Sequence, residues 1–236
     1  MIDAVIQAGG KGTRLRPYTY VLPKPLMPLG NSTLLETNIR WLSKHSLTNV
    51  IVTLGYLGHI IKAVLGNEKH GAKFQYYEES LPLGTAGSLS FLKESLNDDF
   101  LLMNGDLVVD IDLIKFKKQH IENNNGITIG VTKHIQNIEY GVVDIDSGDN
   151  VIGFSEKPSM EYPISMGIYY INNEILSLIP KGAPFGMDDL IKKVLRSGKN
   201  VGVYYHEGEW VDVGRVQHMV DTQNRADNIE SNLLGI

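Results

Sequence analysis

A glycine-rich segment near the start of the chain has the residue types needed to bind an anion. It contains three glycines and three basic residues: Gly9, Gly10, Gly12, Lys11, Arg14 and Arg16. Glycine allows positive φ and removes the Cβ that would block a ligand, so successive N–H groups can point inward as an anion nest. Donors combined with fixed positive charge suit a polyphosphate.

The glycine spacing separates this segment from two other phosphate-binding motifs. The dinucleotide motif G-x-G-x-x-G requires a third glycine where this chain has Leu15, and the Walker motif requires Ser or Thr after its lysine, where this chain has Gly12. These mismatches disfavour an NAD(P)-dependent oxidoreductase. An ordinary β-turn with incidental charges is the remaining alternative, and the proline-rich segment Leu22–Pro28 argues against it.

Two aspartates follow apolar stretches at positions suited to a metal ion. Asp106 comes directly after the apolar run Phe100–Met103 and a glycine, and Asp212 follows Trp210 and Val211. Either residue alone is typical of a turn or a helix cap, but together they can hold one hard cation. Mg²⁺ binds one or two carboxylates and completes its octahedron with phosphates and water. Asp110 and Asp112 are expected to cap the next helix instead.

The elements that must position these residues alternate between apolar and amphipathic segments in the first half of the chain. The expected strands are Ile2–Gln7, Val50–Leu54, Lys73–Tyr77 and Phe100–Met103, and the expected helices are Leu34–His45, Leu57–Leu65, Gly87–Leu96 and Ile111–Ile121. This alternation predicts an α/β fold with a mostly parallel central sheet and helices on both faces. Ligands of such a sheet bind outside the carboxyl ends of its strands, where the glycine segment and both aspartates fall.

The second half of the chain has a different rhythm. Extended runs separated by turn residues are expected at Ile127–Val131, Tyr140–Ile145, Val151–Ser155 and Ile164–Ile171. They predict a small mixed or antiparallel subdomain at one edge of the sheet. Helices Glu174–Ile179 and Met187–Arg196, strands Val201–Tyr205 and Trp210–Val213, and a polar helix Val216–Ile229 are expected to follow.

The composition limits the class of protein. The 236 residues carry a net charge of −5, no cysteine and 42% hydrophobic residues. Nothing in this charge balance attracts nucleic acid, and no long apolar run indicates a membrane span, so a cytoplasmic enzyme is expected. The seven histidines lack zinc-site spacing, and no G-x-S-x-G nucleophile motif is present.

The segment GGKGTRLRP at 9–17, followed by PKPLMPLG at 23–30, resembles the sugar-1-phosphate nucleotidylyltransferases, or nucleotide-sugar pyrophosphorylases. Later matches extend the resemblance to about Asn224. It implies the Rossmann-like fold of nucleotide-diphospho-sugar transferases over 1–236. In that fold about 1–123 would bind the nucleotide, about 124–215 would bind the sugar phosphate, and 216–236 would form a C-terminal helix and tail. The resemblance also implies a homo-oligomer, which nothing else in the sequence indicates.

The resemblance assigns roles to individual residues. As catalytic residues it implies Arg14 on the triphosphate, Lys24 on the phosphates, and Asp106 and Asp212 on Mg²⁺. The nucleotide-binding residues would be Ala8, Gly9, Gly10, Gly12, Thr13, Arg14, Gly84, Thr85, Ala86 and Gly105, and the sugar-phosphate-binding residues would be Gly141, Glu156, Lys157, Gly167 and Trp210. Many relatives carry Asn or Thr where this chain has Ser165 and Met166, which leaves the identity of the sugar open.

The implied reaction joins an NTP to a sugar 1-phosphate and releases pyrophosphate. The sugar phosphate is already an anion, so positioning and charge neutralisation provide most of the catalysis. The PKPLMP segment is most similar to that of mannose- and heptose-1-phosphate guanylyltransferases, which favours GTP over UTP, dTTP or CTP. A cytidylyltransferase for a non-sugar phosphate and an inactive nucleotide-sugar-sensing module are the alternatives. No hexapeptide repeat is present, so no acyltransferase or assembly domain is expected.

Overall fold

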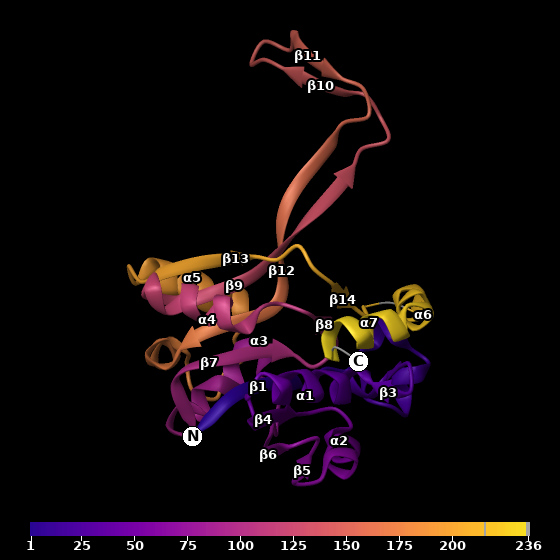
Figure 1. Cartoon of the computed structure of the whole chain (residues 1–236). Helices are drawn as coiled ribbons and strands as arrows, with labels where there is room; N and C mark the ends of the chain where they lie inside the picture. Colours follow the sequence, from indigo (N-terminus) through magenta and orange to yellow (C-terminus); the bar gives the residue numbers. More distant parts are fainter. Residues whose placement is uncertain (215, 235–236) are drawn as a thin grey trace.

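The protein is built around a central sheet, which lies in the lower part of Figure 1. The computed structural model describes residues 1–214 and 216–234. The eight strands lie in the order β13-β9-β12-β7-β1-β4-β6-β5, with bounds β1 Ile2–Ala8, β4 Asn49–Leu54, β5 Glu68–Lys69, β6 Ala72–Glu78, β7 Leu96–Asn104, β9 Asn125–Asn137, β12 Ser159–Asn172 and β13 Asn200–Tyr205. Only β12 and β5 run opposite to the other strands. The predicted α/β class with a mostly parallel sheet is therefore confirmed.

The sheet separates two hydrophobic cores. Successive residues of a strand point to opposite faces, so Ala4 and Ile6 of β1 enter one core, whereas Val5 enters the other. The first core is covered by α1 (Leu34–Lys44), α2 (Gly58–Leu65), α4 (Leu113–Glu122) and α7 (Ala226–Leu234), and the second by α5 (Met187–Arg196) together with the 3₁₀ helix η6 (Asn173–Leu178). The expected helices on both faces are present.

Two of these helices begin at a side-chain cap, and the cap of α4 at Asp112 was predicted. The Thr33 hydroxyl accepts a hydrogen bond from the Glu36 amide at 3.1 Å at the start of α1. The Asp112 carboxylate accepts hydrogen bonds from two amides of the first turn of α4. Such bonds satisfy donors that have no partner within the helix. Asp110 does not cap a helix; its carboxylate lies 2.8 Å from His206 Nε2 instead.

Three expected helices differ from those observed. The predicted helix Gly87–Leu96 is a single turn, α3 (Gly84–Gly87), followed by the 3₁₀ helices η4 (Ser88–Phe91) and η5 (Lys93–Ser95). Ser90 donates its hydroxyl to the Gly87 carbonyl at 2.7 Å, a local bond that competes with helix formation. Glu174–Ile179 is likewise a 3₁₀ helix. The C-terminal helix is divided into α6 (Val216–Asn224) and α7.

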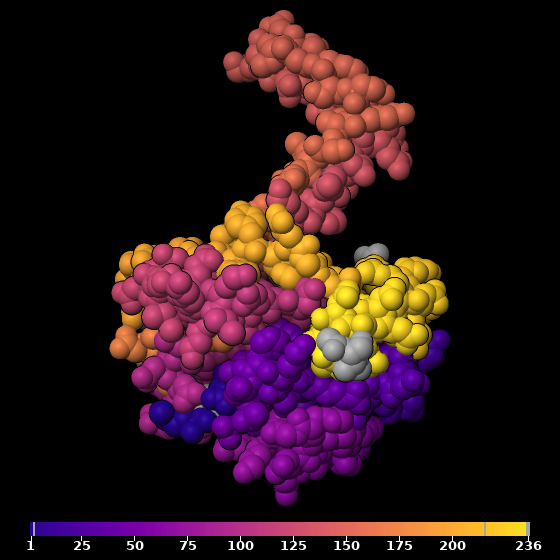
Figure 2. All heavy atoms as spheres, in the orientation of Figure 1, coloured from indigo at the N-terminus to yellow at the C-terminus, as the bar shows by residue number. Residues whose placement is uncertain are grey.

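Two strands continue beyond the sheet as a projecting arm, which we define as residues 132–165. The ends of β9 and β12 form a two-stranded ribbon, and the hairpin β10 (Val142–Ile145) and β11 (Val151–Ser155) forms its tip. Figures 1 and 2 show the arm standing clear of the rest of the molecule. The expected edge subdomain is therefore this arm, while Ile127–Val131 and much of Ile164–Ile171 belong to the central sheet.

Two further two-stranded ladders lie outside the central sheet. One joins β2 (Pro28–Leu29) to β3 (Ser32–Thr33), and the other joins β8 (Leu107–Val109) to β14 (Trp210–Asp212). No helix in residues 1–214 and 216–234 is long and apolar enough to cross a membrane.

Candidate active site

A cavity of about 310 Å³ opens at the carboxyl ends of β1 and β7, where a parallel sheet is expected to bind its ligands. It is lined by Gln7, Ala8, Gly10, Gly12, Thr13, Arg14, Lys24, Pro25, Thr85, Asn104 and Asp106. Most of the residues expected on the nucleotide side therefore line one cavity.

The glycine segment is held in shape by the turn that follows it. Gly12 has a φ of 57°, and a Cβ at this position would lie 2.9 Å from Thr19 Cγ2. Thr19, which is buried, donates its hydroxyl to the Gly12 carbonyl at 2.9 Å. A side chain at Gly12 would thus be strained by the backbone and by this contact. The 3₁₀ helix η1 (Thr13–Leu15) follows and carries the exposed Arg14 at the cavity.

The two predicted metal-binding aspartates come together through the ladder between β8 and β14. This ladder places Asp212 opposite Leu107, the residue that follows Asp106. Lys24 lies between the two carboxylates: its Nζ contacts Asp106 Oδ2 and lies 3.5 Å from Asp212 Oδ1. Lys24 is only 8% exposed, and the two carboxylates offset the cost of burying its charge.

Arg14 lies close to Asp212 in this cluster. A Cβ at Gly214 would lie 3.2 Å from Asp212 Oδ2 and 3.6 Å from Arg14 Nη1. The Arg14 guanidinium therefore lies near the Asp212 carboxylate. The four residues expected to be catalytic form one cluster at the mouth of the cavity, although they come from four separate segments of the chain.

Gly105 lets the loop that carries Asp106 pack against β1. Its amide donates to the Gln7 carbonyl at 2.8 Å, and a Cβ would lie 2.9 Å from that oxygen. A larger residue would push the loop, and Asp106 with it, away from the glycine segment.

The donor set of this cluster fits Mg²⁺. Two carboxylates face a point where a positive charge, the Lys24 ammonium, is already stabilised. Mg²⁺ needs only one or two carboxylates because phosphates and water complete its shell. Across 1–214 and 216–234, no group of three or more His, Cys, Asp or Glu side chains is placed to hold a metal ion. The described residues thus offer a site that a bound phosphate would complete.

The expected nucleotide-binding residues Gly84, Thr85 and Ala86 are tied to the loop before α5. A Cβ at Gly84, whose φ is 75°, would lie 2.8 Å from the Phe185 carbonyl oxygen. The same carbonyl accepts hydrogen bonds from the Ala86 and Gly87 amides at 2.9 and 3.1 Å. Thr85 accepts a bond from the Met187 amide through its hydroxyl and one from Gln7 Nε2 through its carbonyl. Thr85 is the member of this segment that lines the cavity, and the Ala86 amide is already engaged.

Two of the five residues expected on the sugar-phosphate side lie beside the cavity. The register of β12 shifts between Ser165 and Tyr169, and in this bulge Gly167, with a φ of 78°, packs against Asn104. Trp210 donates its indole N–H to the Met166 carbonyl at 3.1 Å. These contacts join the bulge to the strands that carry Asp106 and Asp212.

The other three residues lie on the arm. Gly141 precedes β10, while Glu156 and Lys157 follow β11. A Cβ at Gly141 would lie 3.2 Å from Glu156 Oε2, so these positions are close to one another. None of them lines the cavity of its own chain.

The comparisons with known proteins agree with this geometry. The family described as "Nucleotidyl transferase" matches residues 3–228. The chain belongs to this family. The predicted resemblance to sugar-1-phosphate nucleotidyltransferases is thereby confirmed.

Curated relatives carry names from this family. A mannose-1-phosphate guanylyltransferase catalytic subunit beta of Dictyostelium discoideum is 34% identical over 91% of this chain and 61% of its own length. A D-glycero-alpha-D-manno-heptose 1-phosphate guanylyltransferase of Aneurinibacillus thermoaerophilus is 30% identical over 90% of this chain and 93% of its own length. A UTP–glucose-1-phosphate uridylyltransferase of Synechocystis is 31% identical over 91% of this chain and 61% of its own length. The chain thus spans about three fifths of the length of several relatives.

Solved structures share the fold. HddC from Yersinia pseudotuberculosis has a TM-score of 0.73 at 24% identity and is covered over 99% of its chain, with 95% of this chain aligned. A putative glucose-1-phosphate thymidylyltransferase from Bacillus anthracis has a TM-score of 0.74 at 22% identity, and the match covers 96% of this chain and 95% of that one. At these identities the likeness concerns the fold.

Sequence reasoning missed several residues at the cavity. Gln7, Pro25 and Asn104 line it, and Thr19 fixes the glycine segment from behind. Gln7 and Asn104 are the last polar residues of their strands before a glycine, and this position was the available signal. Thr19 carried no signal, because its role depends on how the loop folds back.

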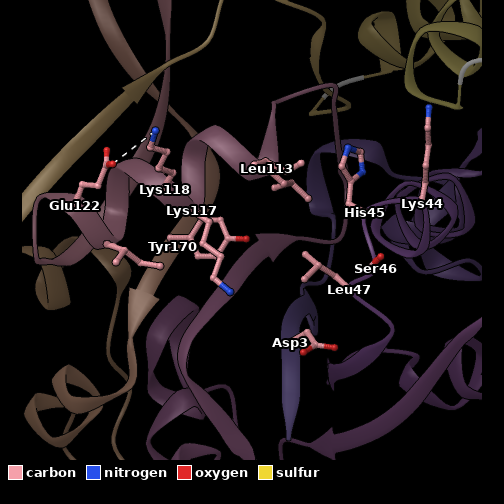
Figure 3. A pocket seen from close by; sticks show the side chains of 12 residues that line it. Asp3, Lys44, His45, Ser46, Leu47, Leu113, Lys117, Lys118, Glu122 and Tyr170 are labelled. Atoms are coloured by element: carbon pink, nitrogen blue, oxygen red, sulfur yellow. Dashed lines mark ion pairs between the residues drawn. The ribbon is translucent and has the colours of Figure 1, made fainter.

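A larger cavity of about 740 Å³ lies at the other end of the strands, near the start of β1. Figure 3 shows Lys44, His45, Lys117 and Lys118 around it, with Lys118 paired to Glu122 at 3.7 Å. Its lining includes Asp3, at the start of β1. Since parallel sheets bind ligands at the carboxyl ends of their strands, the smaller cavity at the glycine segment is the candidate active site.

Proposed function

We propose that this protein transfers a nucleotidyl group from an NTP to a sugar 1-phosphate, giving an NDP-sugar and pyrophosphate. The observation that carries the proposal is the convergence of Arg14, Lys24, Asp106 and Asp212 at the mouth of the glycine-segment cavity. The names of the relatives support this reaction class.

The chemistry needs no protein nucleophile. An oxygen of the sugar phosphate attacks the α-phosphorus of the NTP, and the bond from the α-phosphorus to the bridging oxygen breaks as pyrophosphate leaves. Arg14 and the amides of the glycine segment would stabilise the charge that develops on the pyrophosphate. Lys24 would neutralise charge at the α-phosphate, since its ammonium already lies at the deepest point of the charged cluster.

Asp106 and Asp212 would hold Mg²⁺. When bound, the ion would neutralise phosphate charge and orient the reacting groups. The two carboxylates would fix its position, and the ladder between β8 and β14 would fix theirs. Lys157 would anchor the sugar phosphate, and Glu156 would bind sugar hydroxyls.

GTP is the proposed nucleotide. The relative that this chain covers almost completely is named as a heptose 1-phosphate guanylyltransferase, and the Dictyostelium relative is named as a guanylyltransferase as well. UTP is the second candidate, because a uridylyltransferase shows comparable identity.

A pyrophosphate-release screen tests both statements. With Mg²⁺ present, GTP, UTP, dTTP, CTP and ATP are crossed with mannose-, heptose-, glucose- and glucosamine-1-phosphates. We expect one strong pair, containing GTP and a mannose- or heptose-type sugar. A strong pair with UTP would overturn the nucleotide assignment but not the reaction. Silence across the grid with retained nucleotide binding would favour a sensing role, and silence without binding would refute the whole proposal.

A further inference from the structure

The arm is a two-stranded projection whose part 134–163 makes its described hydrogen bonds and ion pairs only within the arm. Its ladder is unbroken from the pair Asn137 and Ser159 to the pair Val131 and Ser165, and Lys133 Nζ lies 3.1 Å from Glu161 Oε1 across it. Among the described residues, the hydrogen bonds and ion pairs of 134–163 all stay within the arm. Figure 2 shows it projecting away from the rest of the molecule.

The arm exposes nine large apolar or aromatic side chains. They are Ile135, Tyr140, Val143, Ile145, Val151, Ile152, Phe154, Met160 and Tyr162. Tyr140 is 77% exposed and Phe154 is 64% exposed. An isolated two-stranded hairpin is marginally stable in water, and exposed apolar surface beyond scattered single residues marks an interaction site. The arm therefore requires a covering surface.

The length of the arm excludes its own cavity as that surface while the ladder is intact. A strand rises about 3.3 Å per residue, so the ribbon from Val131 to Asn137 carries the tip about 20 Å beyond the sheet. Glu156 and Lys157 lie farther out still. Bringing them back to Asp106 of the same chain would require breaking the ladder at the root of the arm. Reaching the same position in a second molecule requires no such loss.

Charge also favours a second copy of this chain. The arm carries an excess of carboxylates, namely Glu139, Asp144, Asp146, Asp149, Glu156 and Glu161, against Lys133 and Lys157. The edge that surrounds the cavity carries the exposed basic residues Lys11, Arg14 and Arg16. An acidic arm and a basic edge on the same chain are complementary between two copies related by a two-fold axis.

The size of the contact is sufficient for a stable dimer. A stable interface buries about 800 Å² on each partner, from roughly 20–30 residues a side. Residues 132–165 alone provide enough residues for one side of such an interface, and a two-fold exchange uses two arms. The apolar side chains of each hairpin would be buried in the same contact.

We propose that two copies exchange arms, so that Glu156 and Lys157 of one chain complete the sugar-phosphate half of the cavity of the other. The exchange rests on the proposed function for the identity of that ligand. The body supplies the nucleotide half, with Asp106, Asp212 and Lys24. The partner's arm supplies a carboxylate for sugar hydroxyls and an ammonium for the phosphate.

Complementation between two inactive variants tests the exchange. One subunit carries Asp106→Asn, which disables the body, and the other carries Glu156→Ala with Lys157→Ala, which disables the arm. The two are co-expressed with different affinity tags and purified over both. In an exchanged heterodimer, one of the two cavities combines an intact body with an intact arm. We expect about half of the wild-type pyrophosphate release per dimer, whereas each variant alone is at least 10-fold below wild type.

The control replaces a similar acid–base pair far from the cavity. Glu174→Ala with Lys199→Ala removes an exposed ion pair of 3.0 Å, and its homodimer should retain wild-type turnover. A heterodimer as inactive as its two parents would overturn the exchange. Full activity of the Glu156→Ala, Lys157→Ala homodimer would overturn it as well, because the arm would then contribute nothing to the cavity.

The association state is read separately from activity. Sedimentation at assay concentration should show a dimer for the full chain. A variant in which an Asn-Gly turn joins Asn137 directly to Ser159 should be monomeric and should still bind nucleotide, which shows that the body is folded. A monomeric full chain, or an arm-deleted dimer, would refute the exchange. If the full chain releases no pyrophosphate with any substrate, the proposed function fails, and sedimentation still decides on the arm.

Discussion

The carboxyl ends of the central strands and the arm carry two halves of the same expected site, but the two halves are held in different ways. At the strand ends, Lys24, Asp106 and Asp212 are fixed by the ladder between β8 and β14, by the close packing of Gly105 and by their ion pairs with each other. On the arm, Glu156 and Lys157 are fixed only relative to neighbouring arm residues. The first half is complete within one chain and suits groups that must be positioned before the substrate arrives. The second half depends on a contact outside the body.

The largest effect is expected at the rigid half. Replacing Asp106 by Asn removes a full negative charge from the metal site without changing its shape. We expect kcat to fall by about 10²–10³-fold, the scale of losing one preorganised electrostatic group. The fold should be retained, with a lower melting temperature because buried Lys24 loses the charge of its nearest carboxylate. Asp98→Asn is the matched control, because Asp98 is exposed near the other end of the same strand, β7. Wild-type turnover of Asp106→Asn in Mg²⁺ would remove this residue from the site.

Lys24→Ala probes the same cluster through its positive charge. The ammonium lies between two carboxylates in the free protein and would neutralise the α-phosphate in the complex. We expect kcat/KM to fall because the transition state loses about 2–4 kcal/mol of stabilisation. Steady-state kinetics for both substrates measure the effect. An unchanged kcat/KM would show that Lys24 has only a structural role.

A smaller and more selective effect is expected at the arm. Glu156→Ala with Lys157→Ala removes a pair of charge-assisted hydrogen bonds of about 1.5–3 kcal/mol each. The KM for the sugar phosphate should rise by at least about 10-fold, while the KM for the NTP and the melting temperature stay near wild type. An equal rise in both KM values would contradict the division of the site into a body half and an arm half.

The smallest effect concerns the body alone. His120 is buried between Thr128, at 2.8 Å, and Asp99, at 3.2 Å. Burial lowers the pKa of His120 below its ordinary value of 6.5, although the Asp99 carboxylate acts in the opposite direction. The unfolded state therefore binds the proton more readily, so the stability contributed by neutral His120 is complete above about pH 6.5 and is lost as pH falls below it.

Denaturant unfolding between pH 5 and pH 8 measures this dependence. We expect the free energy of unfolding to fall with decreasing pH, and we expect the fall to be weaker in His120→Gln. The arm-deleted variant should keep the wild-type dependence, because His120 contacts only the body. A wild-type dependence in His120→Gln would assign the acid sensitivity to another group.

The sequence predicted the rigid half better than the arm, and the reason is physical. Strand ends and glycines are local signals, so the position of the glycine segment and of Gly105 and Asp106 followed from the rule for parallel sheets. The pairing of β8 with β14, which brings Asp212 to Asp106, joins distant segments that carry no local signal for pairing. The residue types and strand ends suggested that the two aspartates share one cation, and the family resemblance pointed to the same two residues.

The direction of the arm could not be predicted for a related reason. Extended runs in the second half were recognisable, but alternation within a strand does not tell where its partner ends. The register between β9 and β12 continues past the sheet, and this continuation decides that Gly141, Glu156 and Lys157 leave the body. The prediction of a helix at Gly87–Leu96 was wrong. The Ser90 hydroxyl donates a hydrogen bond to the Gly87 carbonyl, which competes with helix formation, and the spacing of apolar residues does not reveal this competition.

The bulge in β12 gives the molecule a built-in optical reporter. Met166, inside the bulge at the root of the arm, accepts the indole N–H of Trp210, and the chain has only two tryptophans. The other, Trp41, is buried in the first core. In a Trp41→Phe background, the emission of Trp210 would follow any tilt of the arm relative to the sheet. The joint between the two regions can therefore be monitored in solution without attaching a label.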